Sequence, residues 1–224
     1  MLTVLLDAHA DAPAAVNEPG FDALDETGLT RLLDLYQPPA PDWLRINLIV
    51  SVSGSAAGPD GTSESLTNRT DRRILGVIRR QADLVVVGAA SVRAEGYRIP
   101  ATATLGIVTG TGDLAGHRIE ASDTARLVVF CPAAAAARVA ETLPGCTVID
   151  VADVDGRLDA AALLRAIRAT GARSIVCEGG PSLAAQLSAI GAVDEVCLTT
   201  SPMLTGTTLP SLGAAAFSPI ALRP

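Results

Sequence analysis

A carboxylate and two glycines stand where a predicted strand passes into a predicted helix. The segment SIVCEGGPSLAAQL, residues 174–187, is an apolar run followed by Glu178, Gly179, Gly180 and Pro181, and then by helically spaced apolar residues. Ligands of open α/β sheets bind beyond the carboxyl ends of the strands. The first turn of the next helix has free N–H groups and a partial positive charge, and glycines let an anion approach the backbone. The pattern fits a phosphate-binding turn, with a tight strand-to-helix connection as the alternative.

A second segment has the same layout. In VVVGAASVRAEGY, residues 85–97, Gly88 and small residues separate a buried strand from a predicted helix start at Ser91. Two such turns on one sheet could hold the two ends of a long anionic ligand. Arg93 could pair with an additional phosphate. A solvated charge near a helix cap is the alternative for Arg93.

The loop GSAAGPDGTSESLTN, residues 54–68, is longer than a minimal strand-to-helix connection, and long loops at this end of a sheet often cover a ligand. It carries hydroxyls at Ser63, Ser65 and Thr67. A solvated surface loop is an equal alternative.

One predicted helix carries a basic cluster of four arginines, Arg72, Arg73, Arg79 and Arg80. Arg72 and Arg79 lie seven residues apart, about two turns, so they share a face that could meet a substrate phosphate. A solvated basic face is the usual alternative. The glycine-rich TGTGDLAG, residues 109–116, fails the spacing of a dinucleotide loop and has no good helix after it, so we interpret it as a turn.

Composition limits the classes of function. The chain has 224 residues, a net charge of −7 and 49% hydrophobic residues, which allow one or at most two domains with a sizeable core. The acidic balance argues against nucleic acid and anionic membranes as partners. Four cysteines without CxxC spacing and only two histidines make a metal site unexpected. Reduced thiols, no membrane-length apolar run and no clear leader predict a cytoplasmic protein.

Predicted strands alternate with predicted helices along most of the chain. The strands are apolar on both faces, which is typical of a largely parallel sheet covered by helices on both sides. We therefore predict a three-layer α/β fold, with an N-terminal extension over 1–42 and one α/β domain over 43–224. The predicted strands are 2–6, 45–53, 82–88, 104–110, 125–131, 146–151, 174–180 and 194–202. The predicted helices are 27–36 (capped by Thr27 or Thr30), 66–80 (capped by Asn68 or Thr70), 91–97, 133–143, 158–171 and 181–191.

Taken together, these segments resemble the reductase domain of riboflavin biosynthesis. This is the carboxyl-terminal domain of the bifunctional deaminase-reductase, and it has the dihydrofolate reductase fold. The resemblance covers about 44–206, and the prefix LYQPPAPDWLR is similar to that of stand-alone actinobacterial-type members. The zinc deaminase signature is absent from the sequence, which favours a stand-alone reductase. Three stretches carry the match: RINLIVSVSG with the DGTS to AEGY region, SIVCEGGPSLAAQL, and VDEVCLTTSPMLTG.

The resemblance implies a function and a set of site residues. It implies NADPH as the hydride donor, a phosphorylated ribosylaminopyrimidine as the substrate, a ribitylamino product, and a homodimer. It places the catalytic role at Ser53 and Glu178, and substrate contacts at Ser63, Arg79 and Glu178. The implied cofactor-binding residues are Val50, Ser65, Gly88, Ser91, Glu95, Gly179, Gly180, Pro181, Ser182 and Leu183.

The sequence departs from the family in two places. The first strand of the family usually ends Ser-Leu-Asp-Gly, whereas this chain has Ser51-Val52-Ser53-Gly54. A serine is not an efficient acid at neutral pH, and Asp60 or Glu64 could take over the role. The last strands of the family are also missing after Pro224, so either the chain is truncated or its end has diverged. Two other functions therefore stay open: a dihydrofolate- or pterin-type reductase on the same fold, and a non-catalytic NADP-binding paralogue.

Overall fold

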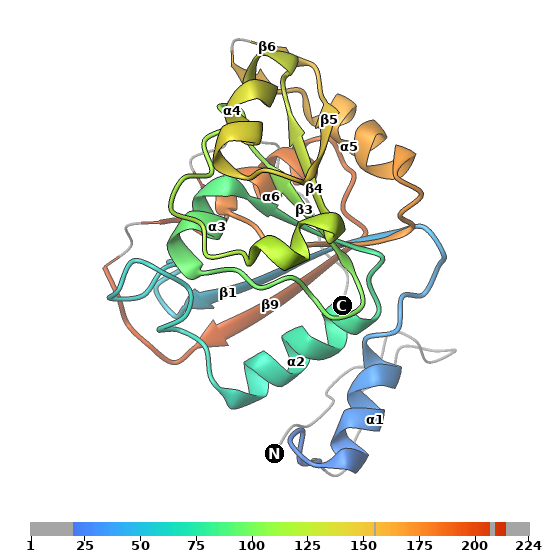
Figure 1. Ribbon diagram of the computed structural model, residues 1–224. Coiled ribbons are helices and arrows are strands. Elements are labelled where there is room, and N and C mark those ends of the chain that lie inside the picture. The colour runs from blue at the N-terminus through green and yellow to red at the C-terminus, as the bar shows by residue number, and fades with distance from the viewer. Residues whose placement is uncertain (1–19, 155, 207–208, 214–224) are drawn as a thin grey trace.

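The structure is a computed structural model that describes residues 20–154, 156–206 and 209–213 (Figure 1). The strand predicted at 2–6 lies outside the described residues. Within them, no helix combines the length and apolarity needed to cross a membrane. Nor do the described His, Cys, Asp and Glu side chains form a group of three or more that could hold a metal ion.

A seven-stranded sheet forms the centre of the fold. Its strand order is β5-β4-β3-β2-β8-β1-β9, and every pairing among the described strands of this sheet is parallel. A separate two-stranded antiparallel hairpin, β6–β7, was not predicted. The strands are β1 Trp43–Ser51, β2 Leu84–Gly88, β3 Thr104–Val108, β4 Leu127–Cys131, β5 Thr147–Asp150, β6 Asp153–Val154, β7 Arg157–Leu158, β8 Ser174–Cys177 and β9 Glu195–Ser201.

Helices cover both faces of the sheet, as the sequence predicts (Figure 1). In β2, Val85 and Val87 belong to one core cluster, and Leu84 and Val86 belong to the other. The first cluster includes side chains of α2, α3 and α4, and the second those of α5 and α6. The helices are α1 Glu26–Leu35, α2 Arg69–Arg80, α3 Ala89–Glu95, α4 Ala136–Thr142, α5 Ala160–Ala169 and α6 Pro181–Ala189, with short 3-10 turns at Ala121–Arg126 and Ala133–Ala135.

Helix caps agree with the sequence at α2 and differ at α1. The Asn68 side chain accepts a hydrogen bond from the Asp71 N–H at 3.0 Å, as one of the two predicted caps. The prediction of Thr27 or Thr30 as the cap of α1 is wrong. Asp25 caps this helix by accepting from the Gly28 N–H at 2.6 Å, because the helix begins one residue before Thr27.

The described part of the N-terminal extension packs against the α/β domain. Leu32 of α1 and Val77 of α2 share a small apolar cluster with Ala23. The Gln81 side-chain amide donates to the Leu33 carbonyl at 2.6 Å. Helix α1 therefore lies beside α2, and the boundary at 42/43 stays a prediction.

Strand β8 places Glu178 at the middle of the sheet. It lies between β1 and β2, with Cys177 paired to Ile46 on one side and to Val86 on the other. The chain leaves the sheet directly after Cys177. Glu178 and the two glycines therefore emerge at the carboxyl edge between two neighbouring strand ends, where ligands of parallel sheets bind.

Candidate active site

Two cavities adjoin at the carboxyl edge of the sheet. The first, here the β3 cavity, has a volume of about 530 Å³ and is lined by the ends of β2 and β3, the starts of α3 and α6, and hairpin β6–β7. The second, the α2 cavity, has a volume of about 770 Å³ and lies between α2, the loop before it and the end of α3. Both volumes fall within the range of about 300–1,000 Å³ typical of small-molecule sites. The residues that line both cavities are Ser91, Glu95, Gly180, Pro181 and Leu209.

Glycine is needed for a different structural reason at each of the two positions after Glu178. Gly179 has a φ of 92°, and a Cβ there would lie 3.2 Å from Cδ2 of Leu48. Its carbonyl accepts a hydrogen bond from the Gly88 N–H at 2.7 Å, which joins the two predicted phosphate turns. Gly180 has an ordinary φ of −59°, but a Cβ there would point at the Ser91 hydroxyl, 3.4 Å away. Glycine at 179 is thus required by the backbone, and glycine at 180 keeps the shared wall open.

Helix α6 begins at this wall with an unsatisfied amide. No side chain caps the helix at Gly180, and Pro181 has no N–H to satisfy. The Leu183 N–H donates to the Gly180 carbonyl at 3.0 Å, whereas the Ser182 N–H has no hydrogen-bond partner among the described residues. Within the described residues, the helix start therefore has one unpaired N–H and the positive end of its dipole beside the β3 cavity.

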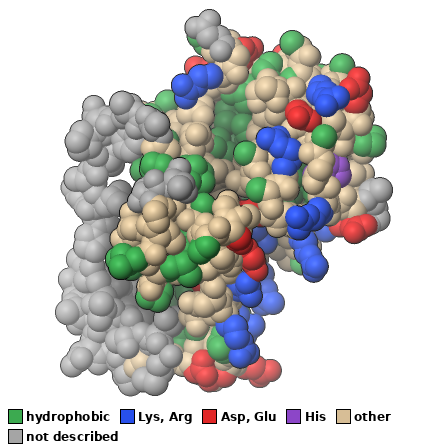
Figure 2. All heavy atoms as spheres, turned by 90° about the vertical axis from the view of Figure 1, so that its left-hand side faces the viewer, with side chains coloured by type: hydrophobic (Ala, Val, Ile, Leu, Met, Phe, Trp, Pro, Cys, Tyr) green, Lys and Arg blue, Asp and Glu red, His purple; other side chains and the backbone are tan. Residues whose placement is uncertain are grey.

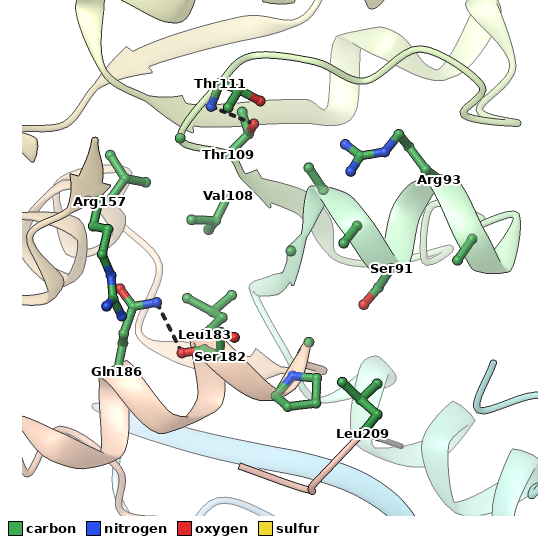
Figure 3. Close-up of a pocket in the computed structure, with 18 of the residues that line it drawn as sticks. Ser91, Arg93, Val108, Thr109, Thr111, Arg157, Ser182, Leu183, Gln186 and Leu209 are labelled. Carbon is green, nitrogen blue, oxygen red and sulfur yellow. Dashed lines mark hydrogen bonds between the residues drawn. The ribbon is translucent and has the colours of Figure 1, made fainter. Parts of the chain in front are cut away.

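Helix α3 supplies the opposite wall. Gly88 precedes its first residue without a side-chain cap, and Ser91 lies in the first turn. At its other end, the Glu95 carboxylate accepts from the Ser63 N–H at 3.1 Å and so fastens the 54–68 loop to the site. Arg93 donates to the backbone carbonyl of Asp113. Figure 3 shows Ser91 and Arg93 projecting from α3 along one side of the β3 cavity.

A charged cluster forms part of the α2 cavity. The Glu178 side chain is only 4% exposed, and its two oxygens accept from Nε and Nη2 of Arg79, each at 2.6 Å. The Tyr97 hydroxyl donates to the same carboxylate. The Arg79 guanidinium also stands 5.3 Å from the centre of the Tyr97 ring. Arg79 and Glu178, both predicted to face substrate, therefore bind each other, and Tyr97 is a member of the site that the sequence analysis missed.

Burial and charge set the proton affinities of this cluster. Burial, and then the Glu178 charge, raise the pKa of Tyr97 well above its usual 10. Burial lowers the pKa of Arg79, but the hydrogen bonds and charge interactions with Glu178 and Tyr97 together outweigh it, and the net pKa rises. Tyr97 therefore remains a neutral donor and Arg79 a cation across the physiological range.

We expect the free energy of unfolding to fall as the pH rises above about 9. Burial raises the pKa of Cys177 to about 12, and the pKa of Tyr97 is also raised. The native state then keeps protons that the unfolded chain releases, so this stabilisation is complete below about pH 9 and is lost as the pH approaches 12. Urea unfolding at several alkaline pH values measures the loss. A pH dependence unchanged in Cys177→Ala and Tyr97→Phe would contradict this assignment.

The structure brings most of the predicted site residues together. Ser63, Arg79 and Glu178 line the α2 cavity. Those lining the β3 cavity are Gly88, Ser91, Glu95, Gly180, Pro181, Ser182 and Leu183. Gly179 lines neither cavity and instead supports the turn.

Besides Gly179, three predicted residues lie outside the lining of both cavities. Val50 is 5% exposed within the core of the sheet. The Ser65 hydroxyl donates to Asp60 at 2.5 Å and faces its own loop. The Ser53 hydroxyl lies in a polar network and donates to the Thr205 carbonyl at 2.7 Å.

Asp60 and Glu64, the two acids considered as substitutes for the family aspartate, also have interaction partners in their own loop or on α2. Hydrogen bonds from Ser65 and then Thr62 lower the pKa of Asp60, which lies outside both cavities. Glu64 lines the α2 cavity and forms an exposed ion pair with Arg72. Glu95 is therefore the carboxylate at the shared wall.

The segment interpreted as a turn does contribute to the site. Thr109, Gly110 and Thr111 line the β3 cavity, which its discounted motif did not anticipate. The segment follows β3, the strand beside β2, so the strand order rather than any glycine spacing places it at the site. Arg157 and Leu209 line cavities too, and no pattern in the sequence had pointed to them.

A parallel sheet with two glycine turns and two adjoining cavities at its carboxyl edge defines an α/β protein that can hold two small ligands side by side. The family model for the RibD C-terminal domain matches residues 42–222 of the sequence. The chain therefore belongs to the RibD C-terminal domain family, which confirms the predicted resemblance and places it among the reductases of the riboflavin pathway.

Solved structures support the same fold. A pyrimidine reductase-like protein from Corynebacterium diphtheriae matches with a TM-score of 0.72 and 22% identity, over 86% of this chain and 90% of that one. A deaminase/reductase from Thermotoga maritima matches with a TM-score of 0.64 and 19% identity, over 82% of this chain and 51% of that one. The riboflavin biosynthesis reductase of Saccharomyces cerevisiae matches with a TM-score of 0.60 and 16% identity, over 87% of this chain and 90% of that one. No curated protein matches the chain by sequence.

Proposed function

We propose that the chain is an NADPH-dependent reductase of a phosphorylated ribosylaminopyrimidine of the 5-amino-6-(5-phosphoribosylamino)uracil type, acting in the cytoplasm in riboflavin biosynthesis. The observation that carries the proposal is the shared wall of the two cavities, formed by Ser91, Glu95, Gly180, Pro181 and Leu209. Hydride transfer requires donor and acceptor carbons at near-contact distance with water excluded. Two cavities that meet along this wall provide such a contact.

The residues of the β3 cavity fit a dinucleotide. The free Ser182 N–H and the start of α6 suit a phosphate, and the start of α3 faces them across the cavity. Gly180 leaves open the space that a Cβ would fill beside Ser91. Ser182 and Leu183 would hold the diphosphate, and the cofactor supplies a hydride when bound. The α2 cavity, with Ser63 and the Arg79–Glu178 pair, would hold the pyrimidine substrate.

The reaction also needs a proton. When hydride adds to C1 of the ribosylamine, the bond from C1 to the ring oxygen breaks and that oxygen takes up a proton. Glu178 is poorly suited to deliver it, because both of its oxygens already accept from Arg79 and Tyr97. Glu95 stands at the shared wall and accepts only the Ser63 N–H among the described residues. We assign the proton donor to Glu95.

Replacement of Glu95 by Gln is expected to lower kcat by about 10²–10⁴-fold, the usual contribution of a positioned acid. The glutamine oxygen still accepts from the Ser63 N–H, so nucleotide binding should persist. Consumption of NADPH with the ribosylaminopyrimidine measures kcat, and a fluorescence titration measures NADPH binding. An unchanged kcat would exclude Glu95 as the donor, and absence of NADPH binding to the wild-type protein would overturn the proposed function.

The position of Ser53 supports a second candidate, a non-catalytic NADP-binding paralogue. Ser53 is bound to the Thr205 backbone and lines neither cavity, so the family aspartate has no replacement at its own position. The paralogue would bind NADPH without turning over ribosylamino or folate compounds. A dihydrofolate-type reductase would instead consume NADPH with dihydrofolate.

A homodimer formed through the sheet is part of the proposal. Strand β9 is an edge of the seven-stranded sheet, and its side chains alternate between partly buried and exposed. Val196 is 38% exposed and Leu198 is 54% exposed on the same face of that strand. Burial of these apolar side chains against a second copy would stabilise the dimer.

A further inference from the structure

Hairpin β6–β7 brings a cation to the β3 cavity. The hairpin packs against the segment that follows β3, since a Cβ on Gly110 would lie 3.0 Å from the Gly156 carbonyl oxygen. Its base is fixed, because Leu158 is buried and the Asp159 N–H donates to the Ala152 carbonyl at 2.9 Å. Arg157 therefore projects from an anchored hairpin into the lining of the cavity.

Arg157 has no counterion among the residues that the structure describes. It forms no ion pair or hydrogen bond within the described chain, whereas Arg93 donates to the Asp113 carbonyl. Figure 3 shows the two arginines on opposite sides of the cavity, with the Arg157 side chain extending toward Gln186 and Ser182. Figure 2 shows a hollow on this face with hydrophobic side chains in its floor and basic side chains to either side. Within the described lining of the β3 cavity the acidic residue is Glu95, at the shared wall.

The order of residues along α6 orients a ligand in the cavity. Pro181 lies at the shared wall, and Gln186 stands five residues further along the helix, a rise of about 7.5 Å. The free Ser182 N–H lies between them in the chain. A dinucleotide with its reacting end at the shared wall and its diphosphate at Ser182 would extend its adenosine toward Gln186 and Arg157.

Two hydroxyls lie on the β3 side of the cavity, across from Gln186. Thr109 is 5% exposed, and its Oγ1 accepts from the N–H groups of Thr111, at 3.3 Å, and Gly112, at 3.0 Å. With its lone pairs engaged, its hydrogen is left to donate. The Thr111 Oγ1 accepts from the Asp113 N–H at 3.4 Å. Figure 3 shows both threonines at the edge of the cavity formed by the end of β3.

We propose that Arg157 binds the 2′-phosphate of the adenosine ribose and so selects NADPH over NADH. The proposal rests on the proposed function, since it assumes a dinucleotide in the β3 cavity. A guanidinium binds a phosphate through two parallel hydrogen bonds, and NADH lacks this group. The role that the sequence analysis considered for Arg93 thereby passes to Arg157, because Arg93 already donates to the main chain.

The test compares Arg157→Gln with Arg165→Gln. Arg165 lies on α5, is exposed and lines neither cavity, so its replacement makes the same charge change outside the site. Calorimetric titration with NADPH, NADH, 2′,5′-ADP and 5′-ADP measures each affinity without catalysis. We expect Arg157→Gln to weaken NADPH and 2′,5′-ADP by about tenfold or more, the usual effect of losing hydrogen bonds to a charged group. NADH and 5′-ADP should bind as before, and Arg165→Gln should change none of the four.

The outcomes separate this inference from the proposed function. If Arg157→Gln weakens the binding of NADPH and NADH equally, or weakens neither, the assignment of Arg157 is overturned. Wild-type protein that binds 2′,5′-ADP no more tightly than 5′-ADP would overturn it too, while leaving a nicotinamide-dependent reductase in place. Wild-type protein that binds neither NADPH nor NADH would overturn the proposed function together with the inference.

Discussion

An Arg79→Met variant is expected to lose about 3–5 kcal/mol of its free energy of unfolding, the usual effect of removing one partner of a buried ion pair. The Glu178 side chain is 4% exposed, and its carboxylate accepts two short hydrogen bonds from the Arg79 guanidinium. Methionine retains much of the apolar stem but leaves the carboxylate buried, with the Tyr97 hydroxyl as its remaining side-chain donor among the described residues. Urea unfolding at neutral pH measures the loss.

Two control variants make this expectation specific. The double variant Arg79→Met with Glu178→Gln removes the charge that was left unpaired, so it should regain much of the lost stability. Arg72→Met breaks the pair with Glu64, whose side chains are 54% and 68% exposed, and should cost less than about 1 kcal/mol. If Arg79→Met is no more destabilising than Arg72→Met, the Arg79–Glu178 pair does not stabilise the site.

The contact between Arg79 and Glu178 could not be predicted from the sequence. Arg79 and Glu178 were each predicted to face the substrate, and both do line the α2 cavity. They are 99 residues apart in the chain, and nothing in either segment indicates that the two side chains bind each other. Their contact depends on β8 lying between β1 and β2, which is a property of the strand order. Tyr97 was missed for the same reason.

Local patterns predicted the elements of the fold well. The apolar runs at β2, β3, β4 and β8 are buried on both faces, so their composition alone indicates parallel strands under two helix layers. Hairpin β6–β7 has only two residues in each strand and no apolar run to mark it. The cavity residues that it contributes, and those of the Thr109 segment, could therefore be found only from the folded arrangement.

The glycine turn contains two adjacent positions at which the same substitution should have opposite consequences. Gly179→Ala is expected to destabilise the fold by about 1–2 kcal/mol, because an L-residue is strained at a φ of 92°. The added Cβ would also lie 3.2 Å from Leu48. Gly180→Ala should leave the free energy of unfolding nearly unchanged, because φ is −59° and the nearest atom to the added Cβ, the Ser91 hydroxyl oxygen, lies at an ordinary contact distance of 3.4 Å.

Nucleotide binding should follow the reverse order. The methyl group of Gly180→Ala enters the wall shared by the two cavities, so NADPH affinity should fall by about tenfold or more, the usual effect of one misplaced methyl group in a fitted pocket. Gly179 lines neither cavity, so the folded fraction of Gly179→Ala should bind NADPH nearly as the wild-type protein does. Urea unfolding and a fluorescence titration on both variants separate the two effects. The only change that Gly180→Ala makes in the site is the added methyl group. Equal NADPH affinity in this variant and the wild type would therefore show that the ligand does not approach the start of α6.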